Sequence, residues 1–147
     1  MRKSALLAPL AAIAACLALV TPAYASTPLN ASCDTSNGDH GVRATAYYST
    51  PTARHHFWSG TVFTLVGSGG TGGQSNMDIY LYQGSTLIAS RHSLDNVVKN
   101  YQYKSTEHPR FYLGEYTDGR FAEHVSFKGT FDVFGRDPSC VAVTTNI

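Results

Sequence analysis

The chain has few charges and lacks the motifs on which several enzyme classes depend. Charged residues make up 14% of its 147 residues, and no run of Lys or Arg is long enough to cover a face. Nucleic-acid binding, which neutralises many phosphates, is therefore not expected. The Gly-x-Ser-x-Gly elbow of α/β-hydrolases is missing. The glycine-rich segment 67–76 has neither the Lys nor the following helix of a P-loop, so we expect a plain connection between strands.

Helical periodicity is also missing, and residues 93–99 would form one short turn at most. The only long apolar run is 5–20, which follows a basic start and precedes the A-x-A cleavage signature at 23–25. We therefore predict a signal peptide at 1–25 and a secreted domain at 26–147, without stable membrane insertion. The alternative is a lipid anchor at Cys16, which ends a lipobox-like stretch, although the apolar run continues beyond it.

Cleavage would leave only two cysteines, Cys33 and Cys140. In an oxidising compartment such a pair normally forms a disulfide, here joining the segment before the first strand to the start of the last. Closing a loop of ~100 residues contributes about 4.7 kcal/mol in chain-entropy models. A free, reactive thiol would need a base and an electropositive niche, and the residues around Cys140 offer neither.

Aromatic residues and period-two alternation dominate the rest of the chain. Val125, Phe127, Gly129, Phe131 and Val133 alternate with polar residues, as in a strand with one buried face. Strands are expected at 42–49, 57–66, 77–82, 86–90, 100–104, 111–117, 124–133 and 140–145. The pattern predicts an all-β fold, a single antiparallel β-sandwich (jelly-roll-like or Ig-like) of about eight strands with one disulfide.

Residues 78–82 (DIYLY), Gly84 and residues 87–90 (LIAS) resemble a stretch of bacterial pre-peptidase C-terminal domains. Residues 111–116 are similar to that family's next aromatic strand, and the resemblance covers roughly 57–134. It implies a jelly-roll-like sandwich of the kind appended to secreted proteases, where it binds matrix polymers or calcium. The acidic cluster that would precede the first strand is absent here, and no cofactor is expected.

Exposed aromatic residues are the first candidates for a binding site. Tyr80 and Tyr82 share one face of their strand, and Tyr101 and Tyr103 share a face of another. Such rings stack on sugars or contact a protein partner. The alternative is that they form a second buried layer, or cross-strand pairs that stabilise the sheet. Trp58 is expected in the core, because its strand is apolar on both sides.

Histidines and carboxylates are the remaining candidates. The six histidines show no metal-ligand spacing, so we predict no metal site; they are His40, His55, His56, His92, His108 and His124. Glu115, Arg120 and His124 flank a turn at Asp118-Gly119, and a hairpin there would suit a small nuclease. Glu115 and Glu123 would suit a glycosidase. Polar residues on a solvated hairpin explain all four equally well.

Together these patterns favour a secreted, monomeric binding module without catalysis. Its partner would be an extracellular polysaccharide or a protein target, held by the tyrosines. The alternatives are a small hydrolase that uses Glu115 and His124, a toxin-like effector, or a protease inhibitor.

Overall fold

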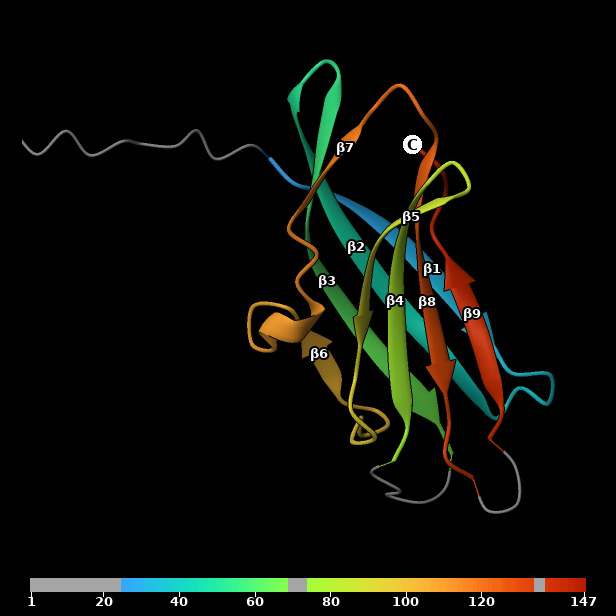
Figure 1. Cartoon of the computed structure of the whole chain (residues 1–147). Coiled ribbons are helices and arrows are strands. Elements are labelled where there is room, and N and C mark those ends of the chain that lie inside the picture. The colour runs from blue at the N-terminus through green and yellow to red at the C-terminus, as the bar shows by residue number, and fades with distance from the viewer. Residues whose placement is uncertain (1–24, 69–73, 134–136) are drawn as a thin grey trace, which may run out of the picture.

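The computed structural model describes residues 25–68, 74–133 and 137–147 (Figure 1). The predicted signal peptide up to residue 24, with Cys16, lies outside these ranges, as do residues 69–73 of the glycine-rich connection. The elements are β1 (Thr27–Asp34), β2 (His40–Thr52), β3 (His55–Gly67), β4 (Asn76–Gln83), β5 (Thr86–His92), β6 (Gln102–Lys104), the 3-10 helix η1 (Pro109–Phe111), β7 (Glu115–Asp118), β8 (Glu123–Thr130) and β9 (Ser139–Val143).

The strands form two antiparallel sheets that pack face to face (Figure 1). The first sheet has the order β1-β2-β3-β6, and β7 pairs with another stretch of β3. The second sheet has the order β5-β4-β8-β9. The predicted all-β antiparallel sandwich is confirmed, with nine strands among the described residues where about eight were expected.

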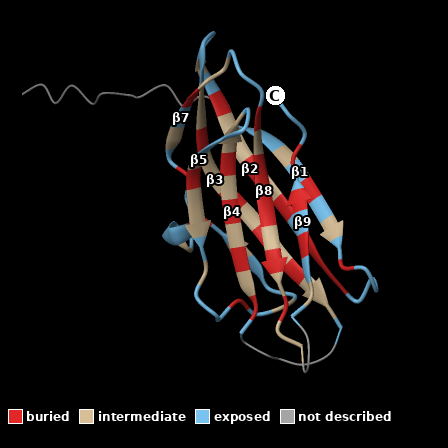
Figure 2. Ribbon diagram, turned by 45° about the vertical axis from the view of Figure 1, so that its right-hand side comes forward, coloured by how far each residue is buried: buried red, intermediate tan, exposed pale blue. Residues whose placement is uncertain are grey.

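Alternation places the core between the two sheets (Figure 2). Along β4, buried Met77, Ile79 and Leu81 alternate with partly exposed neighbours. Trp58 is fully buried, as expected. Full burial of a side chain such as Ile79 or Leu81 contributes roughly 1.5–3 kcal/mol to the free energy of unfolding. At Gly129 the sheets approach so closely that a Cβ atom would lie 2.6 Å from a side-chain carbon of β2.

The disulfide joins the edge strands of the two sheets. Cys33 lies in β1 and Cys140 near the start of β9, with their Cα atoms 6.0 Å apart. The predicted pairing and the position of Cys140 are confirmed. The prediction that Cys33 precedes the first strand is wrong, because the whole of β1 pairs with β2.

The strand predicted at 111–117 is only partly present. Pro109 begins the η1 turn, and Gly114 has a φ of +68°, which ends any extended run across it. Extended pairing therefore starts at Glu115. Residues 93–99 contain no helical turn, and the buried Val97 instead forms an isolated bridge with Ser75.

Candidate functional site

The predicted acid–base set does not come together. The hairpin expected at Asp118-Gly119 does not form, because β7 pairs with β3 in the first sheet and β8 pairs with β4 and β9 in the second. Glu115 lies beside Arg91, with 3.4 Å between Oε1 and Nη2. The His124 ring instead stacks on Tyr82, with centroids 5.1 Å apart. Glu115 and His124 therefore lie in different sheets and contact different partners.

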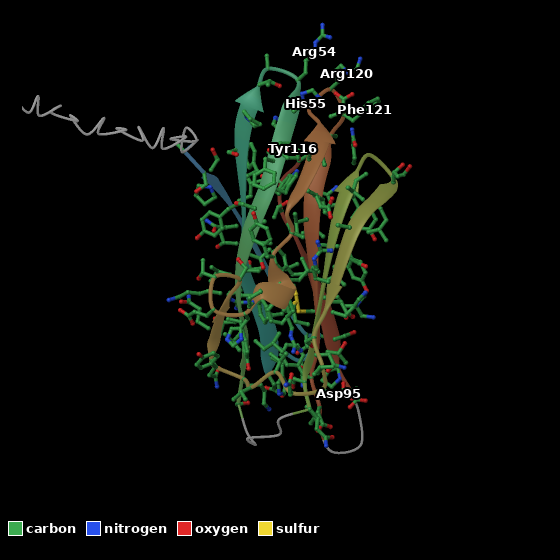
Figure 3. The ribbon with its side chains drawn as sticks, turned by 60° about the vertical axis from the view of Figure 1, so that its left-hand side comes forward. Arg54, His55, Asp95, Tyr116, Arg120 and Phe121 are labelled. Carbon is green, nitrogen blue, oxygen red and sulfur yellow. A yellow bond between two sulfur atoms is a disulfide. The ribbon has the colours of Figure 1, made fainter. Side chains whose placement is uncertain are left out.

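Arg120 forms an ion pair with the neighbouring carboxylate of Asp118. Its Nε–H group donates to both carboxylate oxygens of Asp118, at 2.9 and 3.0 Å. Hydrogen bonds from the Arg120 side chain and then from its backbone lower the pKa of Asp118 to about 2. Arg120 lies at one end of the sandwich, at the same end as Arg54 of the β2–β3 turn and His55 at the start of β3 (Figure 3).

Glu123, the second carboxylate of the glycosidase alternative, is fully buried. Trp58 Nε1–H and Thr117 Oγ1–H each donate to its Oε2 atom at 2.7 Å, and His56 Nδ1 lies 3.3 Å away. A carboxylate without access to solvent does not reach a substrate or an attacking water. In this conformation Glu123 joins β8 to β3 and β7, and it does not form a catalytic pair with Glu115.

Tyr80 and Tyr82 lie on the outer face of the second sheet, with ring centroids 6.4 Å apart. With His92 and His124 they form what we call the tyrosine face. Tyr80 contacts His92 edge-on at 5.8 Å, and both tyrosines are half-buried. Burial, followed by the nearby Asp78 carboxylate, raises the pKa of Tyr80. The rings therefore take part in cross-strand packing and keep some exposed surface.

Tyr101 and Tyr103 belong to the edge of the other sheet. The ring of Tyr103 stacks on the buried Phe63, with centroids 5.2 Å apart, and its hydroxyl accepts the Val98 N–H group at 2.8 Å. Tyr101 packs edge-on against Tyr103 at 4.9 Å and is 48% exposed. The four predicted tyrosines thus form two separate pairs on different sheets.

Each histidine contacts a different neighbour. His40 packs against Phe131, His55 contacts Thr52, and His108 packs among the aromatic residues near β6. Within 25–68, 74–133 and 137–147, no group of three or more His, Cys, Asp or Glu side chains is placed to hold a metal ion. No helix in the same ranges is long and apolar enough to cross a membrane.

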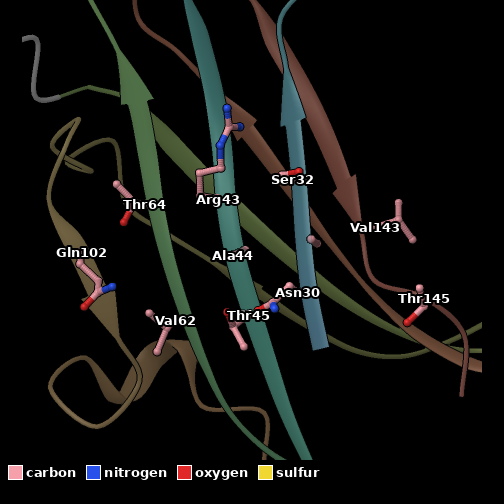
Figure 4. A pocket seen from close by; sticks show the side chains of 11 residues that line it. Asn30, Ser32, Arg43, Ala44, Thr45, Val62, Thr64, Gln102, Val143 and Thr145 are labelled. Atoms are coloured by element: carbon pink, nitrogen blue, oxygen red, sulfur yellow. Dashed lines mark hydrogen bonds between the residues drawn. The ribbon is translucent and has the colours of Figure 1, made fainter. Parts of the chain in front are cut away.

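The outer face of the first sheet carries two hollows that share Val62, and we call them together the outer groove. The first has a volume of about 550 Å³ (Figure 4). Most of its polar lining comes from β1, β2, β3 and β6, and Thr145, which follows β9, adds one more hydroxyl. The polar side chains from the four strands are Asn30, Ser32, Arg43, Thr45, Thr64 and Gln102. Those on β1, β2 and β3 alternate with buried residues of the same strands and so face away from the core.

The second hollow, of about 500 Å³, is more aromatic. Tyr47 and Tyr112 line it together with Lys104 and Gly60. The ladder between β2 and β3 shifts register between Ala46 and Tyr48, and this irregularity lies beside the hollow. Tyr112 is 43% exposed at the end of η1.

Tyr47 and Tyr112 were not among the residues predicted from the sequence to bind a ligand. Tyr47 does follow Arg43 and Thr45 at a spacing of two along β2, which was a usable signal for one shared face. Tyr112 gave no such signal, because it follows a 3-10 turn and reaches the hollow through the tertiary fold.

Comparison of the chain with protein families, curated proteins and solved structures finds no match.

Proposed function

We propose that this protein is a non-catalytic binding domain that holds one chain of an extracellular polymer in its outer groove. The observation that supports this most strongly is the pair of hollows sharing Val62 on one sheet face. Most of the polar lining of the first hollow comes from four hydrogen-bonded strands. At about 4.8 Å between strands, four strands span on the order of 14 Å. That length suits an extended chain better than one compact small molecule.

The lining chemistry supports the same proposal. Thr45 Oγ1 donates to Asn30 Oδ1 at 2.8 Å, which orients the amide at the floor of the groove. The side chains of Ser32, Thr64 and Gln102 make no hydrogen bond within the described part of the chain. They are therefore available to a ligand. Tyr47 and Tyr112 add flat apolar surface in the second hollow.

Export is part of the proposal. The predicted signal peptide would deliver the chain to an oxidising compartment, where a disulfide such as Cys33–Cys140 persists. The resemblance to pre-peptidase C-terminal domains favours the same class of extracellular binding module. The tyrosine face is the competing binding surface, and a protein target such as a protease is the competing partner.

Retention of the purified mature protein on insoluble polymers tests the proposal. The material is a panel of cellulose, chitin, xylan and bacterial cell walls. We expect at least one of them to retain the protein, and Tyr112→Ala and Gln102→Ala each to weaken retention about tenfold. This factor corresponds to about 1.4 kcal/mol, within the range of one lost ring contact for Tyr112 and of one lost hydrogen bond for Gln102.

Variants elsewhere on the surface provide the matched controls. Tyr116→Ala removes a tyrosine that is 66% exposed and lies outside both hollows, so it should leave retention unchanged. Loss of retention with Tyr80→Ala or Tyr82→Ala, but not with groove variants, would move the site to the tyrosine face. Polymer cleavage that Glu115→Gln abolishes would instead favour the hydrolase alternative.

A further inference from the structure

We propose, building on the function above, that the polymer held in the outer groove is an uncharged, hydroxyl-rich polysaccharide. The groove-lining residues include two cations, Arg43 and Lys104, and no carboxylate. Two unopposed cations would favour an acidic polymer. Both cations, however, already have an acidic partner of their own within the chain.

Arg43 is held by three oxygen atoms of its own sheet. Its Nη2 atom lies 2.7 Å from Asp34 Oδ1, and its Nη1 atom donates to the carbonyl oxygens of Cys33 and Val42 at 2.9 Å. An anionic ligand would have to displace Asp34, or be repelled by it. The guanidinium therefore contributes a flat surface to the first hollow, while its positive charge is balanced by Asp34.

Lys104 in the second hollow has the same arrangement. Its Nζ atom lies 3.3 Å from Glu107 Oε1, and both side chains are about half exposed. At this separation the positive charge of Lys104 is offset within the chain. The groove thus lacks the excess positive charge that concentrates and orients anionic polymers.

The polar groups that remain available are neutral. The Gln102 amide can donate through its NH₂ group and accept through its carbonyl oxygen. The Ser32 and Thr64 hydroxyls can each donate and accept a hydrogen bond. A sugar hydroxyl is likewise donor and acceptor, so the two sets match without any ionic partner. Tyr47 and Tyr112 provide rings on which the apolar face of a sugar ring can lie.

A polypeptide ligand fits this surface less well. Extended peptides gain affinity mainly by pairing their backbone with a free strand edge. The outer groove instead lies across strands that already pair with one another, β1 with β2, β2 with β3, and β3 with β6. Most of the backbone beneath the groove is therefore committed to the sheet.

Affinity electrophoresis with matched soluble polymers tests the ligand class. The probes are hydroxyethyl cellulose, xylan, galactomannan and dextran, each compared with its carboxymethylated derivative. We expect at least one neutral polymer to retard the protein, and its carboxymethylated form to bind at least tenfold more weakly. Affinity for the neutral polymer should change less than about twofold from 0.05 M to 1 M salt. At 1 M salt the Debye screening length is only about 3 Å, so an affinity that depended on charge would fall.

Charge-removing variants separate the ligand class from the function itself. The control is Lys128→Gln, which removes a cation of the second sheet outside both hollows and should change the affinity for the neutral polymer less than about threefold. Tighter binding of the carboxymethylated polymer, lost in high salt and in Lys104→Gln, would overturn the inference and leave the proposed binding function standing. Failure of all four neutral polymers would also overturn it. Binding that Gln102→Ala and Tyr112→Ala leave unchanged would overturn the groove as the site.

Discussion

Replacement of Glu123 provides the sharpest test of how the two sheets are held together at the end where β7 lies. This carboxylate is fully buried, and its Oε2 atom accepts hydrogen bonds from Trp58 and Thr117 at 2.7 Å each. His56 lies 3.3 Å from the same atom. One side chain of β8 thus links strands β3 and β7 of the opposite sheet.

Glu123→Ala would leave the Trp58 Nε1–H group buried without an acceptor, and it would leave the Thr117 hydroxyl with only the His56 carbonyl oxygen, 3.4 Å away. Each unsatisfied donor costs about 1–3 kcal/mol, and the lost packing adds to that. We therefore expect a loss of about 3–5 kcal/mol in the free energy of unfolding, a large part of the stability of a small domain. Glu123→Gln keeps a carbonyl acceptor for both donors, and we expect a loss of roughly 1–2 kcal/mol.

Urea unfolding of the oxidised protein measures these differences. Circular dichroism follows the sheets, and the fluorescence of Trp58, the only tryptophan, follows the site itself. Glu107→Ala is the matched control, because it removes an exposed glutamate whose ion pair is worth at most about 1 kcal/mol. A Glu123→Ala variant within about 0.5 kcal/mol of the unmodified protein would refute the reasoning, as would one more stable than Glu123→Gln.

Three further predictions follow from single contacts. Gly129→Ala places a methyl group 2.6 Å from a core side chain of β2, so we expect the urea midpoint to fall with a loss of about 1–3 kcal/mol. Replacing both Cys33 and Cys140 by serine should lower the free energy of unfolding by about 2–5 kcal/mol. Two titratable thiols in the native mature protein would contradict the disulfide. Arg120→Gln should raise the pKa of Asp118 from about 2 toward 3.8 in an NMR titration. Because the folded-state pKa of Asp118 is depressed, its contribution to stability is present above pH 4 and is lost as the pH falls toward 2; an unchanged pKa would exclude Arg120 as the cause.

Local alternation was enough to predict most strands and the class of the fold. The residues 125, 127, 129 and 131 do face the core, and β8 covers most of the predicted stretch. The period-two signal works because a strand with one buried face needs an apolar side chain at every second position. β1 was missed because its apolar positions, Leu29, Ala31 and Cys33, are weak and interrupted.

The candidate site was much less predictable. Glu115 and His124 are close in sequence, and a hairpin was the simplest way to connect them. The chain instead crosses from one sheet to the other between β7 and β8, so the two side chains lie in different sheets. Glu123 looked like one more solvated carboxylate, and only the packing of β3 and β7 around it makes it a buried acceptor.

The sequence by itself therefore determined the alternation of the strands, the pairing of Cys33 with Cys140 and the position of Trp58 in the core. Each of these depends on local patterning or on there being only two cysteines in the predicted mature domain. Only the tertiary structure decided which strands are neighbours. The outer groove, the separation of the tyrosine pairs and the burial of Glu123 all follow from that order. The physical reason is that strand register joins residues far apart in the chain, such as Thr64 of β3 and Gln102 of β6, which no local pattern specifies.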